Sequence, residues 1–117
     1  MINGIDAHYY LAKDYERALA FYRDALQLEP TTDFGGGVEF VLADGTAFGL
    51  ASMPNGEWHA GGGVMFAVPD VEAAVERVRA GGGTTVSGIM DQPTCVTVWC
   101  YDTEGNNFAL HRLKAQE

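Results

Sequence analysis

A motif that occurs twice constrains the fold of this chain more than any other feature. Residues 9–14 and residues 65–70 each form a short apolar run that ends at an aspartate and leads into a helix-like segment. The two aspartates, Asp14 and Asp70, are 56 residues apart in a chain of 117. A repeat with this period predicts two structural modules of nearly equal length.

The length of the chain predicts that both modules share one domain. At 117 residues it has the usual size of a domain with a single hydrophobic core. We expect modules at about 1–55 and 60–117, joined by a loop-rich segment at 53–63. No apolar run approaches the roughly 18 to 20 residues that a membrane helix needs, and the N-terminus has no secretory pattern. We therefore expect a cytoplasmic protein with no membrane partner.

Local patterns predict the same order of elements, βαβββ, in each module. An aspartate at a helix start accepts hydrogen bonds from free amides, so Asp14 and Asp70 are expected to be N-caps. Apolar residues at spacings of three and four predict helices at about 14–27 and 70–80, the second ending at glycines 81–83. Strand-like runs follow the helices at 38–42, 47–51, 84–86, 95–101 and 107–111. Residues 31–37 are expected to be a loop.

The charge of the chain excludes one class of partner. Seven basic and sixteen acidic residues give a formal charge of −9, which repels phosphate backbones and anionic lipids. No nucleic-acid partner is expected. An acidic surface serves solubility, and it can also attract a cationic ligand.

The two cysteines are expected to be buried free thiols. Cys95 and Cys100 are five positions apart in one strand-like run, and an odd separation sends their side chains to opposite faces. No second Cys or His stands beside either one at the spacing of metal ligands. A disulfide, a redox pair and a metal site are therefore all disfavoured here.

Three motifs carry a resemblance to a known family. Residues 14–26 are similar to its helix pattern D-x-x-R-x-x-x-F-Y-x-x-x-L, residues 68–74 with glycines 82–83 match its second module, and residues 102–106 resemble its D-P-x-G-N turn. The family is the vicinal-oxygen-chelate superfamily of glyoxalases, bleomycin-resistance proteins and dioxygenases. The resemblance implies an α+β fold in which two βαβββ modules form a curved, half-barrel mixed sheet around a cavity. In the turn, Gly105 and Asn106 are expected to supply the positive φ angles.

The same resemblance implies that the usual metal site is missing. Metal-using members place His, Glu or Gln ligands at four recurrent strand positions. Counted from the aspartates, these positions fall on Ala7, Gly49 or its neighbour Leu50, Gly63 and Ala109. None of these side chains can donate a lone pair, and a divalent ion needs about four to six donors. We therefore expect no metal and no cofactor.

The three histidines do not restore such a site. His8 is one residue away from the first ligand position, so its side chain is expected on the opposite face, outward or against a helix. His59 lies in the joining loop, where a solvated side chain is the expectation. His111 shares the parity of Ala109, which makes it either a cavity residue near the rim or a plain surface residue.

Strand parity predicts which residues face the ligand, since residues two apart share a face. The resemblance adds Thr97 and Trp99 on the last but one strand, because these positions match substrate contacts of related fosfomycin-resistance enzymes. The predicted ligand-binding residues are Tyr9, Leu11, Met65, Thr97, Trp99, Asn107 and His111. This mostly apolar and aromatic set suits an amphipathic or flat organic ligand, with small residues at the former ligand positions leaving room. The alternative is that these side chains pack together and fill the half-barrel.

Two functions remain open. One is a metal-free binding protein similar to bleomycin-resistance proteins, sequestering an amphipathic or aromatic and cationic ligand. Tyr9, Trp58, Trp99 and the acidic net charge favour it. The other is a glyoxalase-related lyase, transferase or dioxygenase-like enzyme acting on a small organic substrate. Only His111 and Glu39 are titratable residues near the expected cavity, and a solvent-facing position is favoured for Glu39. The family also implies a homodimer, because a second chain often completes the cavity or covers a sheet edge.

Overall fold

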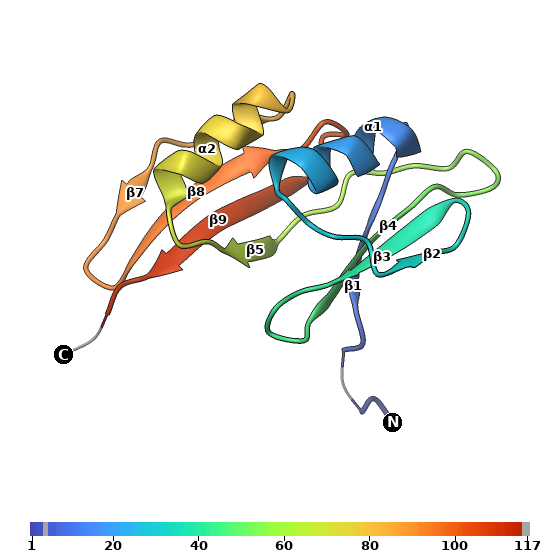
Figure 1. Ribbon diagram of the computed structural model, residues 1–117, viewed down its shortest axis with the longest axis horizontal. Coiled ribbons are helices and arrows are strands. Elements are labelled where there is room, and N and C mark those ends of the chain that lie inside the picture. Colours follow the sequence, from blue (N-terminus) through green and yellow to red (C-terminus); the bar gives the residue numbers. More distant parts are fainter. Residues whose placement is uncertain (4, 116–117) are drawn as a thin grey trace.

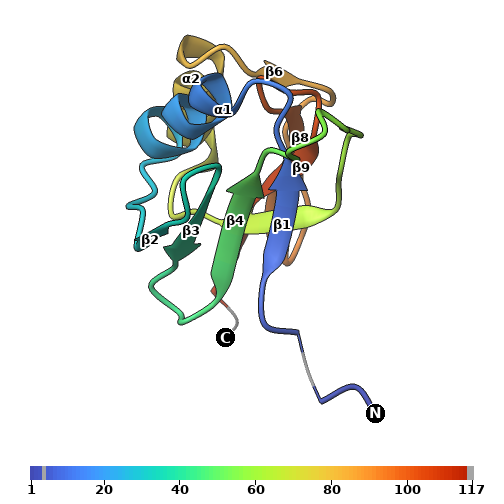
Figure 2. The same ribbon diagram turned by 90° about the vertical axis from the view of Figure 1, so that its right-hand side faces the viewer.

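The computed structural model, which describes residues 1–3 and 5–115, has two sheets with the helices on one side of them (Figures 1 and 2). Gly4 and residues 116–117, which the predicted domain includes, lie outside the described residues. The first module contains β1 (His8–Leu11), α1 (Tyr15–Ala20), η1 (Phe21–Ala25), β2 (Thr32–Asp33), β3 (Gly37–Val41) and β4 (Ala47–Ala51). The second contains β5 (Val64–Ala67), α2 (Val71–Ala80), β6 (Thr84–Thr85), β7 (Met90–Asp91), β8 (Cys95–Tyr101) and β9 (Asn107–Leu113). No helix in the described part of the chain has the length and apolar character needed to cross a membrane.

The two sheets have equivalent topologies. The strand order is β1-β4-β3-β2 in the first and β5-β9-β8-β6 in the second, and β7 also pairs with β8. The first strand of each module runs parallel to the last, and the remaining pairs are antiparallel. Both sheets are therefore mixed, and the predicted βαβββ order is confirmed, with β6 and β7 forming two pieces of one interrupted strand.

One strand lies where the sequence predicts a loop. Residues Thr32 and Asp33 pair with β3 as the short edge strand β2, inside the 31–37 segment. Two paired polar residues, followed by Phe34 and a run of glycines, carry no alternating apolar pattern, so periodicity could not reveal this strand.

Both helices begin as predicted. The carboxylate of Asp14 accepts from the Arg17 amide at 3.1 Å, and that of Asp70 accepts from the Ala73 amide at 3.0 Å. The second helix ends at glycines, with Gly82 in the left-handed region at φ 96°, a conformation that glycine adopts without a Cβ clash.

The first helix departs from the prediction of one regular helix over 14–27. After Ala20 it widens into the π-helical turn η1, in which the Leu26 amide donates to the Phe21 carbonyl at 3.3 Å. The wider turn lets two consecutive aromatic residues, Phe21 and Tyr22, both enter the core, where they are 2% and 0% exposed. Tertiary packing therefore decides the geometry here, and the 3.6-residue pattern alone could not show it.

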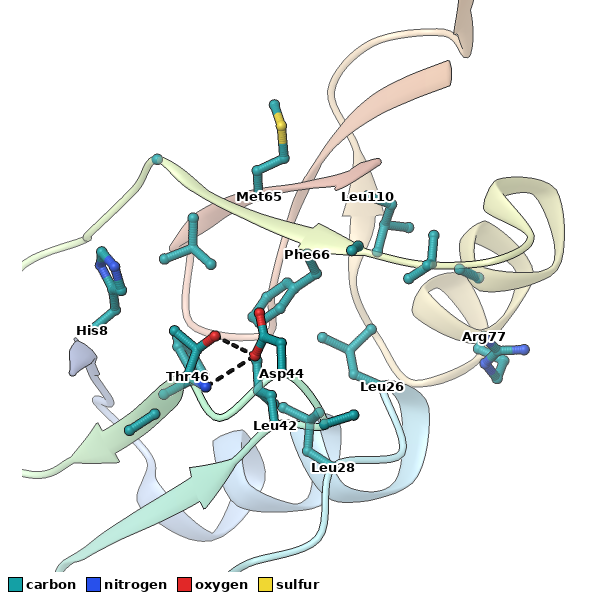
Figure 3. A pocket seen from close by; sticks show the side chains of 18 residues that line it. His8, Leu26, Leu28, Leu42, Asp44, Thr46, Met65, Phe66, Arg77 and Leu110 are labelled. Atoms are coloured by element: carbon teal, nitrogen blue, oxygen red, sulfur yellow. Dashed lines mark hydrogen bonds between the residues drawn. The ribbon is translucent and has the colours of Figure 1, made fainter. Parts of the chain in front are cut away.

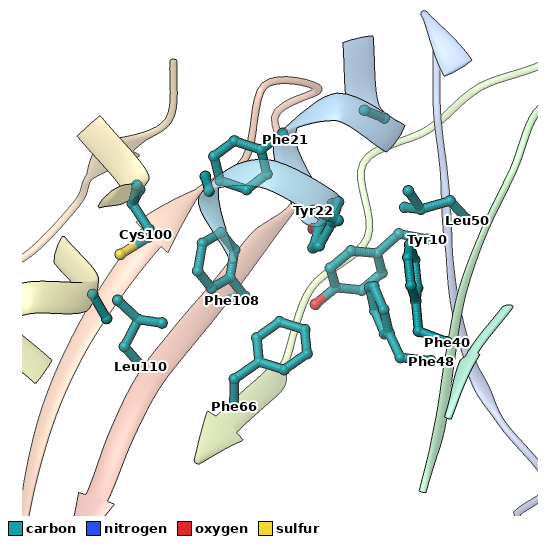
Figure 4. Packing of buried hydrophobic residues seen from close by; sticks show 14 of the residues in the cluster. Tyr10, Phe21, Tyr22, Phe40, Phe48, Leu50, Phe66, Cys100, Phe108 and Leu110 are labelled. Atoms are coloured by element: carbon teal, nitrogen blue, oxygen red, sulfur yellow. The ribbon is translucent and has the colours of Figure 1, made fainter. Parts of the chain in front are cut away.

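An aromatic cluster fills the space between the helices and the two sheets (Figure 4). The ring of Tyr22 lies 5.2 Å from Phe48 of the first sheet and 6.4 Å from Phe66 of the second, measured between centroids. Each buried aromatic or aliphatic side chain of this kind stabilises the fold by about 1.5 to 3 kcal/mol. Because the core takes the side chains that point toward the helices, alternate strand residues are left on the opposite face.

Candidate functional site

The face of the sheets that points away from the helices, which we call the outer face, holds the predicted ligand-binding residues. On β8, Val96 and Val98 point into the core, so Thr97 and Trp99 point outward. The same alternation applies on the other strands. It places Tyr9, Leu11, Met65, Thr97, Trp99, Asn107 and His111 on the outer face. The strands put these residues on one face, and their contact with a ligand stays a prediction.

In the first sheet, three outer-face residues lie side by side on neighbouring strands. Gly49 on β4 is flanked by Tyr9 on β1 and by Glu39 on β3. The Tyr9 hydroxyl donates to the Glu39 carboxylate at 2.5 Å, and the Tyr9 ring lies over Gly49 so closely that a Cβ there would overlap it. The expectation that Gly49 leaves room for a ligand is therefore wrong, because Tyr9 covers the position.

The equivalent row in the second sheet is apolar. Ala109 on β9 is flanked by Met65 on β5 and by Trp99 on β8. Ala109 is fully buried, Met65 is 47% exposed and Trp99 is partly exposed, so a thioether and an indole form the surface above the alanine. The Ser87 hydroxyl accepts from the Trp99 amide at 3.1 Å, which fixes the backbone that carries the indole.

Two of the four positions that the resemblance gives for metal ligands lie in these two rows, and the other two, Ala7 and Gly63, lie just before β1 and β5. Gly49 and Ala109 lie in the middle of the rows. Neither glycine nor alanine has a donor atom in its side chain, so the residues present do not fit a metal ion. Across residues 1–3 and 5–115, no three or more His, Cys, Asp or Glu side chains gather where they could hold a metal ion.

Two predicted residues have structural contacts as well as an outer-face position. The Asn107 side-chain carbonyl accepts from the Gly63 amide at 2.9 Å, and its backbone carbonyl accepts from the Tyr10 hydroxyl at 2.7 Å. Asn107 therefore holds the linker and β1 against the second sheet. Thr97 is 7% exposed and pairs with His111, which is partly exposed beside it.

The other histidines and the second tryptophan lie elsewhere. His8 is exposed on the helix side of β1, as its parity predicts, and His59 is exposed in the linker. Trp58 is half-buried, with the Lys13 ammonium 5.7 Å from its ring centroid and Gly105 beside it. Trp58 thus belongs to the contact between the linker and the β8–β9 turn.

The β8–β9 turn, which carries the D-x-x-G-N motif, is a buried polar network. The Asp102 carboxylate accepts from the Tyr22 hydroxyl at 2.7 Å and from the Asn106 side-chain amide at 2.9 Å. Asn106 also donates to the Leu11 carbonyl at 3.2 Å and accepts from the Gly61 amide at 2.7 Å. Residues of the first module, the linker and the second module are therefore joined through one turn.

Glu104 extends this network to the start of α1. Its carboxylate accepts from the Asp14 amide at 2.6 Å and from Arg17 Nε at 2.7 Å. Burial raises the pKa of Glu104, but these donors, together with the Thr103 hydroxyl, outweigh burial and hold the pKa below its ordinary value. In the turn itself Gly105 has φ 86°, whereas Asn106 does not have the positive φ that we expect from the sequence.

The cysteines are free thiols, as predicted. Cys100 is fully buried, and burial raises the pKa of its thiol to about 11. Cys95 is only partly buried, so the prediction of burial holds for one of the two.

A cavity of about 630 Å³ lies between the modules, lined by α2, the segment after η1, the β3–β4 turn and both faces of β5 (Figure 3). Of the predicted ligand-binding residues only Met65 lines it. His8, which the sequence places away from the ligand, lies at this cavity instead.

Comparison with known proteins assigns the family. The family model described as Glyoxalase/Bleomycin resistance protein/Dioxygenase superfamily matches residues 4–110. The chain belongs to this superfamily. A comparison with curated protein sequences gave no match.

Several solved structures share the fold at low sequence identity. TnmS3, an antibiotic-binding protein from Streptomyces sp. CB03234, superposes with a TM-score of 0.78 at 19% identity, over 97% of this chain and 98% of that one. A glyoxalase/bleomycin resistance protein from Albidiferax ferrireducens T118 gives 0.77 at 18% identity, over 92% and 97%. The fosfomycin resistance protein FosX from Listeria monocytogenes gives 0.73 at 19% identity, over 96% and 94%.

Proposed function

We propose that this chain is a cytoplasmic, metal-free small-molecule-binding protein that sequesters an amphipathic or aromatic and cationic ligand, in the manner of bleomycin-resistance proteins. The observation that carries the proposal is the row Met65–Ala109–Trp99 on the outer face of the second sheet. It presents an indole and a thioether to the outside, at the place where metal-using relatives hold an ion.

The chemistry of this row suits a flat or cationic ligand. A cation over an indole face is attracted by about 0.5 to 2 kcal/mol. Thr97 and His111, in the adjoining row, add a hydroxyl and an imidazole. The net charge of −9 raises the local concentration of cations. The shared fold of the antibiotic-binding protein TnmS3 is consistent with such a role.

The proposed ligand site includes a second copy of the chain. Within one chain, Tyr9 and Met65 are 44% and 47% exposed on the outer face, so the two rows remain open to the outside. A second chain packed against this face would cover them and enclose a ligand, which gives a homodimer. Sedimentation is expected to give twice the chain mass of 12.6 kDa at micromolar concentration, and a mass of one chain would contradict the dimer.

The hydrogen-bonded pair Tyr9–Glu39 favours a second candidate, an enzyme acting on a small organic substrate. Glu39 lies on the outer face beside Tyr9, whereas the sequence alone favoured only a solvent-facing position for it. The hydrogen bond to Glu39 raises the pKa of the Tyr9 hydroxyl, so Tyr9 keeps its proton and is the hydrogen-bond donor of the pair, with the Glu39 carboxylate as the acceptor. Elemental analysis separates the candidates in part, because stoichiometric zinc, nickel or manganese in the purified protein would favour the enzyme.

The proposed function is tested by ligand protection against heat. Unfolding midpoints are measured for the wild type, Trp99→Ala and Trp58→Ala, with and without cationic glycopeptides and flat aromatic cations. At least one ligand is expected to raise the wild-type midpoint, since a ligand at 100 times its Kd stabilises by about 2.7 kcal/mol.

The two variants distinguish a binding residue from a packed one. Protection is expected to be lost in Trp99→Ala and kept in Trp58→Ala, because Trp58 is a linker residue that packs against the β8–β9 turn. If no ligand protects the wild type and Trp99→Ala only loses about 3 to 5 kcal/mol of stability, Trp99 is a packing residue and the proposal fails.

A further inference from the structure

The cavity between the modules is an open pocket that shares Met65 with the row Met65–Ala109–Trp99 and otherwise lies apart from that row (Figure 3). Its volume of about 630 Å³ falls within the range of small-molecule sites, about 300 to 1,000 Å³. The end of the first helical segment and the β3–β4 turn line one side, and β5 and α2 line the other. The apolar walls are formed by Leu26, Leu28, Leu42, Val64, Phe66 and Val68.

The repeat explains why this space is open. The β3–β4 turn at 42–46 is the counterpart of the buried turn at 102–106, 60 residues later. The buried turn fills the gap next to α1 with Asp102, Glu104 and Asn106. In the first module the same places carry Leu42, Asp44 and Thr46, which do not make this network. The gap next to α2 is therefore left as a cavity.

One cationic side chain, Arg77 of α2, lines this cavity without a partner. Its Nε is buried and has no hydrogen-bond partner among residues 1–3 and 5–115. The neighbouring Arg79 on the same helix is paired, with Nη1 at 3.6 Å from Glu76 and Nη2 donating to Thr85 at 3.3 Å. A buried donor without an acceptor costs free energy, and an acceptor brought by a ligand would remove that cost.

Among the polar groups that line the cavity, Arg77 is the one suited to bind an anion. The Asp44 carboxylate accepts hydrogen bonds from the amide and the hydroxyl of Thr46, so its partners lie within its own turn. His8 lies on the β1 side of the cavity, apart from Arg77 (Figure 3). The lining thus combines one unpaired guanidinium with a leucine and valine wall.

We infer that the cavity binds an amphipathic carboxylate of medium chain length, with its carboxylate on Arg77 and its alkyl chain along the leucine wall. A guanidinium pairs with a carboxylate through two parallel hydrogen bonds, and these charge-assisted bonds are stronger than neutral ones. The site uses α2 and the β3–β4 turn and shares only Met65 with the row Met65–Ala109–Trp99, so its binding group Arg77 is separate from Trp99 and from the function proposed for that row.

Calorimetric titration with decanoate and with decan-1-ol, both below their aggregation concentrations, tests this site. The two ligands share an alkyl chain and differ in charge. The wild type is expected to bind decanoate at least about tenfold more tightly than decan-1-ol, and Arg77→Met is expected to remove that difference by weakening decanoate alone. Arg79→Met is the matched control on the same helix and is expected to leave both affinities unchanged.

Two further variants test whether the ligand binds in this cavity. Ala43→Trp, on the exposed turn that lines the cavity, is expected to weaken both ligands, and Trp99→Ala is expected to weaken neither. Without ligand, Arg77→Met is expected to unfold at or above the wild-type midpoint, because it removes a buried group that lacks a partner. The inference is overturned if decanoate does not bind, if it binds no better than decan-1-ol, if Arg79→Met weakens it as much as Arg77→Met, or if Trp99→Ala abolishes its binding.

Discussion

The two equivalent hairpin turns of this protein differ in burial and in hydrogen bonding. The turn at 102–106 is buried and hydrogen-bonded to α1, β1, η1 and the linker. The turn at 42–46 is exposed at Asp44, Gly45 and Thr46, and the bonds of its aspartate stay inside the turn. One end of the molecule is closed by polar side chains, and the other holds a cavity.

The difference shows how a repeated fold acquires two roles from a few residues. Asp102 and Asn106 bring carboxylate and amide groups that can satisfy donors and acceptors across the module boundary, whereas their counterparts Leu42 and Thr46 cannot. The family motif at 102–106 therefore acts in stability. The predictions below test this division between a structural turn and an open one.

The largest expected effect is at Asp102. Replacing it in Asp102→Ala removes the acceptor of a buried hydroxyl and of a buried amide, so we expect a loss of about 3 to 5 kcal/mol of unfolding free energy. For comparison, Asp44→Ala, which removes the aspartate of the exposed turn, is expected to cost less than about 1 kcal/mol. Urea denaturation measures the unfolding free energy of both variants, and equal losses would contradict the structural difference between the two turns.

A smaller effect is expected at Glu104, and it depends on pH. Its side chain is fully buried against the half-exposed Arg17, so Glu104→Gln is expected to cost about 2 kcal/mol at pH 7. Because the folded pKa is lowered, the contribution of the carboxylate is complete above its ordinary pKa and disappears as the pH falls through the folded value. The gap between wild type and variant should therefore narrow in acid, and a gap that stays constant from pH 7 to pH 3 would contradict the ion pair.

The smallest effect is expected at Thr46. Its hydroxyl and amide bind only Asp44 within the exposed turn, so Thr46→Ala is expected to change the unfolding free energy by no more than about 0.5 kcal/mol. Its counterpart Asn106 is fully buried, and Asn106→Ala should cost several times more. Thermal denaturation of the two variants under one condition makes the comparison, which fails if Thr46→Ala is the more damaging.

Local patterns predicted those parts of the fold that depend on neighbours in the chain. The N-caps at Asp14 and Asp70, the second helix and the alternation of the strands all follow from spacing, and alternation in turn placed Trp99 on the outer face. The π-helical turn at Phe21 could not be predicted, because packing against both sheets produces it.

The parts of the site that depend on contacts between residues far apart in the chain could not be predicted from the sequence either. The side of the sheet on which Glu39 lies follows from the pairing of β3 with β4 and from the hydrogen bond between its carboxylate and Tyr9. The cavity beside Arg77 reflects the failure of one turn to reach α2, which no local pattern records. Its only sequence signal was the mismatch between residues 42–46 and 102–106, visible once the repeat is aligned.

The central claim, that a ligand binds on the Trp99 row, is tested most directly by fluorescence of single-tryptophan variants. The chain has two tryptophans, so Trp58→Phe leaves Trp99 as the reporter and Trp99→Phe leaves Trp58. Titration with a cationic glycopeptide and with a flat aromatic cation is expected to give a saturable change in the emission of Trp99 and none in that of Trp58. A saturable change in Trp58 alone, or no change in either variant, would contradict binding at Trp99.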